Sequence, residues 1–359
     1  MTRHHSPAPT RRALLKGSAL AAAMLAAPWL RAQEAASAPA SATAAAVERI
    51  PKLTLAGPYA SVSTGFIRIV EAGLLADVAD SVEFLTWKDP DQLRAFALEG
   101  KADFIAMPSN VAANLYNRGV ALRLLCISVW RILYIVSSDP DIKTLDDLKG
   151  KEVLMPFRGD MPDIVFATLC EKLGISIGQG ADAVTLRYTA TPLDAMQLLL
   201  TRRARHALLA EPAASVGMRK SRSLPVSAIA PALLRSVDMQ QEWARAFGSQ
   251  PRIPQAGITV MGPHMDNAPL VARFMQAYEE AQNWCNAQPD ECGKLVAARV
   301  DMLTPEGVAD SMRAAPGEVV SAAKARAELE FFFEKLAARQ PKLIGGKLPG
   351  DAFYWNSEA

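Results

Sequence analysis

Two arginines and two carboxylates carry the charged chemistry that stands out in this sequence. Arg131 follows Trp130, Arg158 and Asp160 flank a glycine, and Glu211 ends a short apolar run. A guanidinium matches the geometry of a carboxylate, sulfonate or phosphate, so Arg131 and Arg158 indicate either an anionic ligand or salt bridges to Asp160 or Glu211. The two carboxylates could instead meet an amine or a ring N–H of the ligand.

Aromatic and hydroxyl side chains occur close to these charges along the chain. Tyr59, Trp87, Trp130 and Phe157 offer flat apolar surfaces, which favour a ring-bearing or partly apolar molecule over a bare inorganic ion. Trp87 could equally belong to the core. The other candidates for ligand contact are Ser61, Ser63, Pro108, Ser109, Asn110 and Met161. The serines are also suitable helix caps.

Motifs of catalysis and metal binding are scarce. His206 and His264 have no neighbours at metal-ligand spacing, so we expect no metal and no cofactor. The sequence contains no G-x-S-x-G, H-E-x-x-H or P-loop motif, which argues against an enzyme. Of 39 Lys and Arg and 37 Asp and Glu residues, five basic and no acidic ones lie in the first 32 positions. The remainder is slightly acidic and has no field suited to nucleic acid.

The first 32 residues are typical of an export signal. A basic segment containing Arg11 and Arg12 precedes an uncharged apolar run, residues 17–30, that is too short to span a bilayer core of ~30 Å. Arg11-Arg12 followed by Ala-Leu-Leu-Lys favours the twin-arginine type over an ordinary secretory signal. We expect cleavage near residue 32, a flexible tether over 33–49, and a periplasmic mature protein.

The sequence contains four cysteines, all beyond the export signal. Cys126 and Cys170 lie in apolar runs and are expected to be buried thiols. Cys285 and Cys292 flank a predicted helix end and turn, and they could form a disulfide in an oxidising compartment. The sequence leaves that pairing open.

Beyond residue 50, short apolar runs alternate with helical segments, a pattern typical of parallel α/β sheets. The expected strands are 52–57, 81–87, 103–107, 122–138, 151–157, 184–189, 206–211 and 256–263. They fall into two series of similar size, the second beginning near residue 151. The sequence therefore predicts an α/β protein with two lobes, each a mainly parallel sheet flanked by helices.

Two of the expected strands end alike. Residues 103–108 read DFIAMP, and residues 206–212 read HALLAEP. In an open parallel sheet, ligands sit beyond the carboxyl ends of the strands, where the following helices begin. The sequence therefore predicts that each lobe contributes a row of turns to a shared cleft, and that the candidate residues lie in those turns.

Four segments in a fixed order carry a resemblance to a known family: KLTLAGPYAS, GKADFIAMPSN, LDDLKGKEVLMPF and HALLAEPAA. The chain, over about residues 50–335, resembles the solute-binding proteins of ABC importers for nitrate, alkanesulfonates, taurine and thiamine-pyrimidine precursors. The resemblance implies a type II periplasmic-binding fold whose chain crosses between lobes near residues 127–137 and 245–262. Lobe I would comprise 50–130 plus 258–359, and lobe II 131–257.

The resemblance also implies a function. A monomer would capture a small anionic organic ligand, such as a sulfonate, an aromatic acid or a pyrimidine-like compound, and deliver it to a membrane permease. A ligand-sensing module that docks on a membrane receptor is an alternative. The fungal thiamine-pyrimidine synthase shares this fold and is an enzyme, but the sequence lacks its cysteine-rich motif and histidines.

Overall fold

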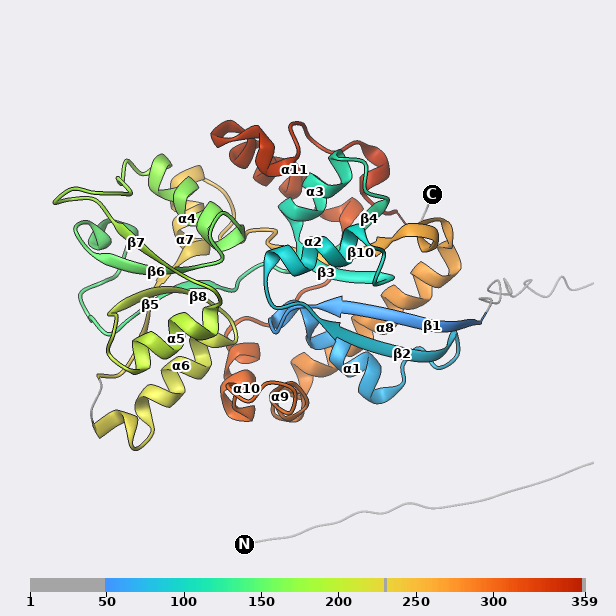
Figure 1. Ribbon diagram of the computed structural model, residues 1–359, viewed down its shortest axis with the longest axis horizontal. Helices are drawn as coiled ribbons and strands as arrows, with labels where there is room; N and C mark the ends of the chain where they lie inside the picture. Colours follow the sequence, from blue (N-terminus) through green and yellow to red (C-terminus); the bar gives the residue numbers. More distant parts are fainter. Residues whose placement is uncertain (1–48, 229–230, 357–359) are drawn as a thin grey trace, which may run out of the picture. The chain divides into compact units, whose positions relative to one another are not determined.

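The computed structural model describes residues 49–228 and 231–356, which belong to one compact unit formed by residues 45–359. The expected export signal and nearly all of the expected tether lie outside the described residues. Within the described part, no helix is long and apolar enough to cross a membrane. The strands form two sheets, which Figure 1 shows as separate groups.

The first sheet has six strands in the order β11-β4-β10-β3-β1-β2. β1 is parallel to β2 and β3, whereas β10 is antiparallel to β3 and β4, and β11 is antiparallel to β4. The strands are β1 (Ile50–Gly57), β2 (Ala79–Thr86), β3 (Phe104–Pro108), β4 (Leu122–Val129), β10 (Ala256–Met261) and β11 (Val320–Ser321).

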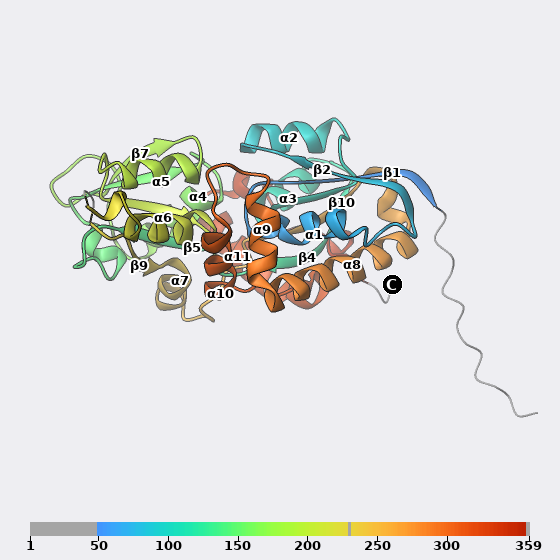
Figure 2. The same ribbon diagram turned by 90° about the horizontal axis from the view of Figure 1, so that it is seen from below.

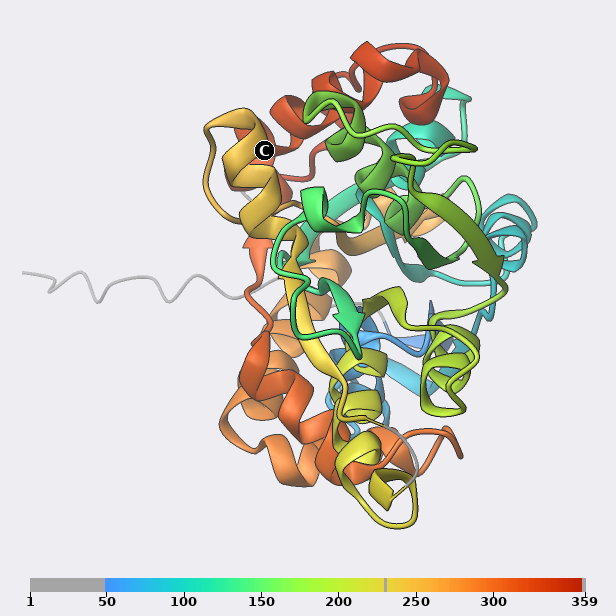
Figure 3. The same ribbon diagram turned by 90° about the vertical axis from the view of Figure 1, so that its left-hand side faces the viewer.

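The second sheet has five strands in the order β7-β6-β8-β5-β9, and it faces the viewer in Figure 3. β6 is parallel to β7 and β8, whereas β5 is antiparallel to β8 and β9. The strands are β5 (Leu133–Ser137), β6 (Glu152–Pro156), β7 (Thr185–Thr189), β8 (His206–Ala210) and β9 (Leu234–Asp238).

Both sheets are mixed, which corrects the expectation of mainly parallel sheets. In each sheet, one strand that follows a crossing of the chain runs antiparallel to both of its neighbours: β5 in the second sheet and β10 in the first. Such strands read as ordinary apolar runs in the sequence, so their direction cannot be recognised there. The α/β class and the division into two sheets are confirmed.

The apolar stretch 122–138 is two strands rather than one. β4 ends at Val129 in the first sheet, and β5 begins at Leu133 in the second. The returning crossing lies beside this one, because Ile253 N donates to Trp130 O at 3.1 Å and Gln255 N donates to Val129 O at 3.0 Å. The chain therefore passes between the two sheets close to the expected lobe boundaries. The division into two lobes that move relative to each other stays a prediction.

The α-helices that follow β2, β6 and β7 begin at residues whose side chains accept hydrogen bonds from the first turn. The side chain of Asp89 accepts a hydrogen bond from Gln92 N just before Pro90, and Thr191 forms a capping box with Asp194. The helices are α1 (Thr64–Ala72), α2 (Pro90–Leu98), α3 (Ser109–Asn117), α4 (Met161–Lys172), α5 (Pro192–Leu200), α6 (Ala213–Arg222), α7 (Met239–Phe247), α8 (Ala268–Ala287), α9 (Pro289–Ala297), α10 (Pro305–Ala314) and α11 (Ala322–Arg339).

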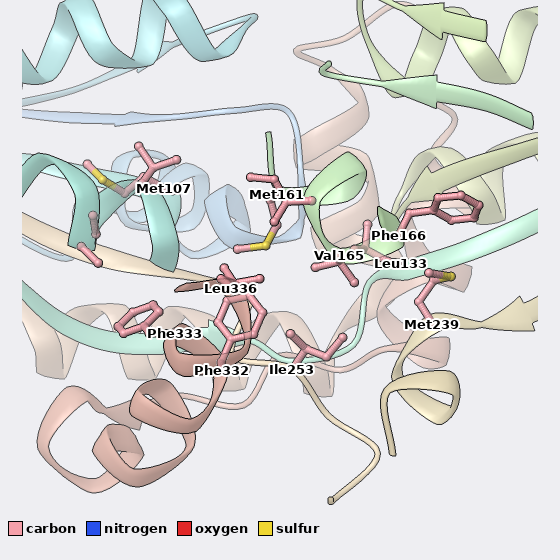
Figure 4. Packing of buried hydrophobic residues seen from close by; sticks show 14 of the residues in the cluster. Met107, Leu133, Met161, Val165, Phe166, Met239, Ile253, Phe332, Phe333 and Leu336 are labelled. Carbon is pink, nitrogen blue, oxygen red and sulfur yellow. The ribbon is translucent and has the colours of Figure 1, made fainter. Parts of the chain in front are cut away.

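The C-terminal helices contact both sheet regions. α8 packs on α1, but α10 contacts α6, and α11 contacts both β4 and α4 (Figures 1 and 2). The ring centroid of Phe332 in α11 lies 5.4 Å from that of Trp243 in α7. Figure 4 shows Phe332 and Leu336 in the same buried cluster as Val165 and Ile253. One continuous apolar core therefore spans the junction of the two sheets.

Candidate functional site

A cavity of about 300 Å³ lies at the junction of the two sheets. Six parallel strands, three in each sheet, direct their carboxyl ends toward it. The ends of β1, β2 and β3 and the turns after them contribute Pro58, Tyr59, Ala60, Val62, Trp87, Lys88, Pro90, Met107 and Pro108. The ends of β6, β7 and β8 and the turns after them contribute Phe157, Asp160, Met161, Pro162, Thr191, Pro192, Leu193, Ala210, Glu211, Pro212 and Ala213. The walls thus come from both sheets, as expected of a ligand site at the carboxyl edge.

Each of the six turns contains one proline that lines the cavity: Pro58, Pro90, Pro108, Pro162, Pro192 and Pro212. Proline fixes its backbone in a conformation suited to the start of a helix, so it sharpens the strand-to-helix turn. Proline also lacks a backbone N–H. The cavity wall therefore contains fewer backbone N–H donors than it would if other residues stood at these six positions.

One backbone N–H near the start of each of α3, α4 and α6 is already used within the protein. Ser109 N donates to Gln255 O at 3.0 Å, and Met161 N donates to the Asp160 side chain at 3.1 Å. Ser215 N donates to Glu211 Oε2 at 3.0 Å. These three N–H groups are therefore not free to bind a ligand.

Aromatic and aliphatic side chains make up most of the wall. Tyr59, Trp87 and Phe157 line the cavity together with Met107 and Leu193. Trp87 is both wall and core, because it is buried and its Nε1–H donates to Ala106 O at 3.1 Å. Phe157 has φ 55°, a left-handed conformation that is unusual for a bulky side chain and is often found at functional sites.

Two buried carboxylates line the cavity, and each has its own arginine. Arg94 Nη2 lies 2.8 Å from Asp160 Oδ2, and Arg235 pairs with Glu211. The side chain of Glu211 also accepts hydrogen bonds from Ser215 N and Oγ, both at 3.0 Å. Burial raises the pKa of both carboxyl groups, and the paired arginine opposes this shift in each case. Neither arginine lines the cavity itself.

Lys88 is the other charged residue of the wall. It is exposed, and its backbone N–H donates to the Gln92 side chain at 2.7 Å. Among the described residues, no carboxylate lies within salt-bridge distance of its ammonium group. Lys88 is thus the charge of the cavity wall that the protein does not neutralise.

Half of the residues proposed from sequence line the cavity, and half do not. Those in the wall are Tyr59, Trp87, Pro108, Phe157, Asp160, Met161 and Glu211. The other seven are Ser61, Ser63, Ser109, Asn110, Trp130, Arg131 and Arg158. Contact of any of these residues with a ligand stays a prediction.

The two arginines proposed as anion-binding groups lie outside the cavity wall. Arg131 is exposed, and its Nε–H donates to Pro251 O at 3.0 Å. Arg158 is exposed, and its guanidinium lies 4.8 Å from the ring centroid of Tyr188. The alternative of salt bridges to Asp160 or Glu211 is wrong, because those carboxylates pair with other arginines.

The five remaining residues lie in other pockets or form hydrogen bonds within the protein. They are Ser61, Ser63, Ser109, Asn110 and Trp130. Ser61, Trp130 and Arg131 line a separate, narrow pocket, and Trp130 Nε1–H donates to Glu318 O at 3.0 Å. Ser63 is buried and makes no side-chain cap to α1, and Ser109 Oγ donates to Pro254 O at 2.5 Å. Asn110 is buried and lines a different pocket.

Several wall residues were missed. Lys88, Thr191 and Leu193 follow strands, so the carboxyl-end rule applied to every strand would have found them. Gln255 comes from the returning chain crossing, and Val300 comes from the turn between α9 and α10. No local pattern marks these two, because tertiary folding alone brings them to the cavity.

No Ser, Cys or His lines the cavity in the described part of the chain. Burial raises the pKa of the Cys126 and Cys170 thiols to about 12, which keeps both protonated. Cys285 and Cys292, whose pairing the sequence left open, form a disulfide between α8 and α9 with Cα atoms 5.2 Å apart. The described residues contain no cluster of His, Cys, Asp or Glu that could hold a metal ion.

The fold has clear counterparts among solved structures. No family model and no curated protein matches the sequence. An ABC transporter protein from Parabacteroides distasonis has a TM-score of 0.66 at 20% identity, over 85% of this chain and 98% of that chain. The chain has the fold of a periplasmic solute-binding protein.

Two further structures show this fold with different named ligands. The periplasmic aliphatic sulphonate binding protein SsuA from Escherichia coli has a TM-score of 0.62 at 14% identity, covering 85% of this chain and 92% of its own. The periplasmic nitrate-binding protein NrtA from Synechocystis has a TM-score of 0.57 at 14% identity, covering 74% and 70%. The expected periplasmic-binding fold is therefore confirmed. At these sequence identities the similarity concerns the fold and not the ligand.

Proposed function

We propose that this protein is the extracytoplasmic solute-binding component of an ABC importer. It binds a small organic ligand between two lobes and delivers it to a membrane permease driven by a cytoplasmic ATPase. The observation that carries the proposal is the cavity at the junction of the sheets, walled by turns after three parallel strands of each. The structural counterparts named for sulfonate and nitrate binding support it.

The lobes move about the two chain crossings in this proposal. Lobe I comprises residues 50–130 plus 258–359, and lobe II comprises residues 131–257. Gln255 Nε2–H donates to Gln240 Oε1 at 2.7 Å, and Gln240 in turn exchanges hydrogen bonds with the Leu133 backbone at 3.2 Å. These buried bonds tie the outgoing and returning crossings together, so the crossings can act as one hinge.

The proposal includes a cellular context. The twin-arginine type signal over residues 1–32 is removed on export, and the mature monomer acts in the periplasm without a cofactor. The protein is not an enzyme in this proposal, in keeping with a described cavity wall that contains no serine, cysteine or histidine. It does not bind nucleic acid.

Uptake and binding measurements test the proposal. The purified protein is titrated with candidate ligands by calorimetry, and uptake of the labelled ligand is compared in cells with and without the gene. We expect one ligand per chain, unchanged chemically after incubation, and uptake that requires the gene. A ligand that alters transcription or motility without uptake would favour the sensing alternative, and conversion to a product would favour an enzyme.

A further inference from the structure

The cavity lacks the features with which proteins hold a small inorganic oxyanion. Such an ion needs several N–H or guanidinium donors, often from helix N-termini. Here each of the six turns places a proline in the wall, and one N–H at the start of each of α3, α4 and α6 is used within the protein. Arg131 and Arg158 lie outside the wall. What the cavity offers instead is apolar surface.

The two carboxylates of the wall are also not free to hold a cationic ligand. Asp160 is bound by Arg94 and by Met161 N, and Glu211 is bound by Arg235 and Ser215. An ammonium ligand would have to displace an arginine that already neutralises each buried carboxylate. The charges of the two pairs cancel, which leaves the ammonium of Lys88 as the net charge of the wall.

We propose that the ligand is a bulky, mainly apolar monoanion, and that Lys88 binds its anionic group at the rim of the cavity. The inference rests on the proposed function and narrows its ligand class. The apolar body lies against Tyr59, Trp87 and Phe157, whose faces supply most of the binding free energy through burial. Lys88 orients the ligand and favours anionic ligands over neutral and cationic ones.

Matched compounds separate charge from shape. The panel uses three apolar bodies: cyclohexane, toluene and naphthalene. Each body is tested as a triple of compounds that carry a carboxylate, a carboxamide or an aminomethyl group. Nitrate and methanesulfonate represent small oxyanions. Calorimetry at low and at raised salt measures the affinity of each compound. We expect the carboxylate to bind best in each triple, with larger bodies binding more tightly.

Variants of Lys88 test the assigned residue. Lys88→Gln should weaken carboxylate binding about tenfold and leave carboxamide binding unchanged, because a charge-assisted hydrogen bond at the rim is lost. Lys88→Arg should keep the affinity within about threefold of the wild type. Raised salt should weaken binding to the wild type but not to Lys88→Gln, since exposed charges are screened. Arg131→Gln and Arg158→Gln are the matched controls, and both should bind like the wild type.

Several outcomes overturn the inference. One is that an amine, nitrate or methanesulfonate binds most tightly. Another is that the carboxylate and the carboxamide of a triple bind with equal affinity. A third is that Arg158→Gln loses as much carboxylate affinity as Lys88→Gln. Failure of every triple to bind also counts against it. The proposed function is judged separately, by native mass spectrometry for a co-purifying molecule of any class and by the uptake assay.

Discussion

Arg94 and Asp160 form a salt bridge of 2.8 Å that joins the regions of the two sheets. Arg94 lies on α2, between two strands of the first sheet, whereas Asp160 is the N-cap of α4 in the second. Asp160 lines the cavity and is buried, while Arg94 reaches it from outside the wall. The pair therefore links the two sheet regions beside the cavity, although Arg94 itself does not line the cavity.

Replacement of Arg94 tests this role. Arg94→Gln leaves the buried Asp160 carboxylate without its ionic partner, which should lower the free energy of unfolding by about 1–3 kcal/mol and speed ligand dissociation. Urea unfolding and stopped-flow dissociation measure the two effects. Arg187→Gln is the control, because Arg187 and Glu152 form an exposed pair worth about 0–1 kcal/mol. Equal effects of both substitutions would contradict a special role for Arg94.

His206 should make stability depend on pH in a defined window. Burial lowers the pKa of His206 from 6.5 to about 4, and its Nδ1 lies 2.9 Å from Ser137 Oγ. Between these pH values the unfolded chain binds a proton that the folded protein does not, so stability falls as the pH falls from 6.5 to about 4.

Urea unfolding at several pH values checks this expectation. His206→Gln should lose part of the slope between pH 6.5 and about 4. The role of His206 is rejected if its substitution leaves the slope unchanged.

The disulfide between Cys285 and Cys292 should be present in the exported protein. Alkylation of the denatured, unreduced chain should modify two thiols, and reduction should raise that number to the four cysteines of the sequence. The double variant Cys285→Ser/Cys292→Ser should lose about 2 kcal/mol of stability, because the closed loop is short. Four modified thiols without reduction would show that the pair does not form.

The sequence predicts the cavity wherever a strand runs directly into a helix. Pro108 and Glu211 line it because each follows a recognisable apolar strand, and Phe157 follows from the same rule. These residues can be placed from the sequence because strands and the turns that follow them have recognisable local patterns.

The charge partners could not be predicted in this way. Arg94 belongs to α2 and is part of no recognisable motif, and Arg235 belongs to β9, which no alternating pattern marks. Arg131 is close to the cavity along the chain, yet its backbone position between β4 and β5 sends the side chain to Pro251. Which arginine meets which carboxylate depends on how the two sheets are placed, and that is a property of the whole fold.

The most direct test of the binding cavity is calorimetric titration of the tightest-binding arenecarboxylate into the wild type, Ala210→Phe and Ala272→Phe. Ala210 ends β8 in the cavity wall, so a phenyl group there fills the cavity, whereas Ala272 is exposed on α8. We predict one site per chain in the wild type and in Ala272→Phe, and at least a tenfold loss of affinity in folded Ala210→Phe. Wild-type affinity in Ala210→Phe would contradict a ligand site between the two sheets.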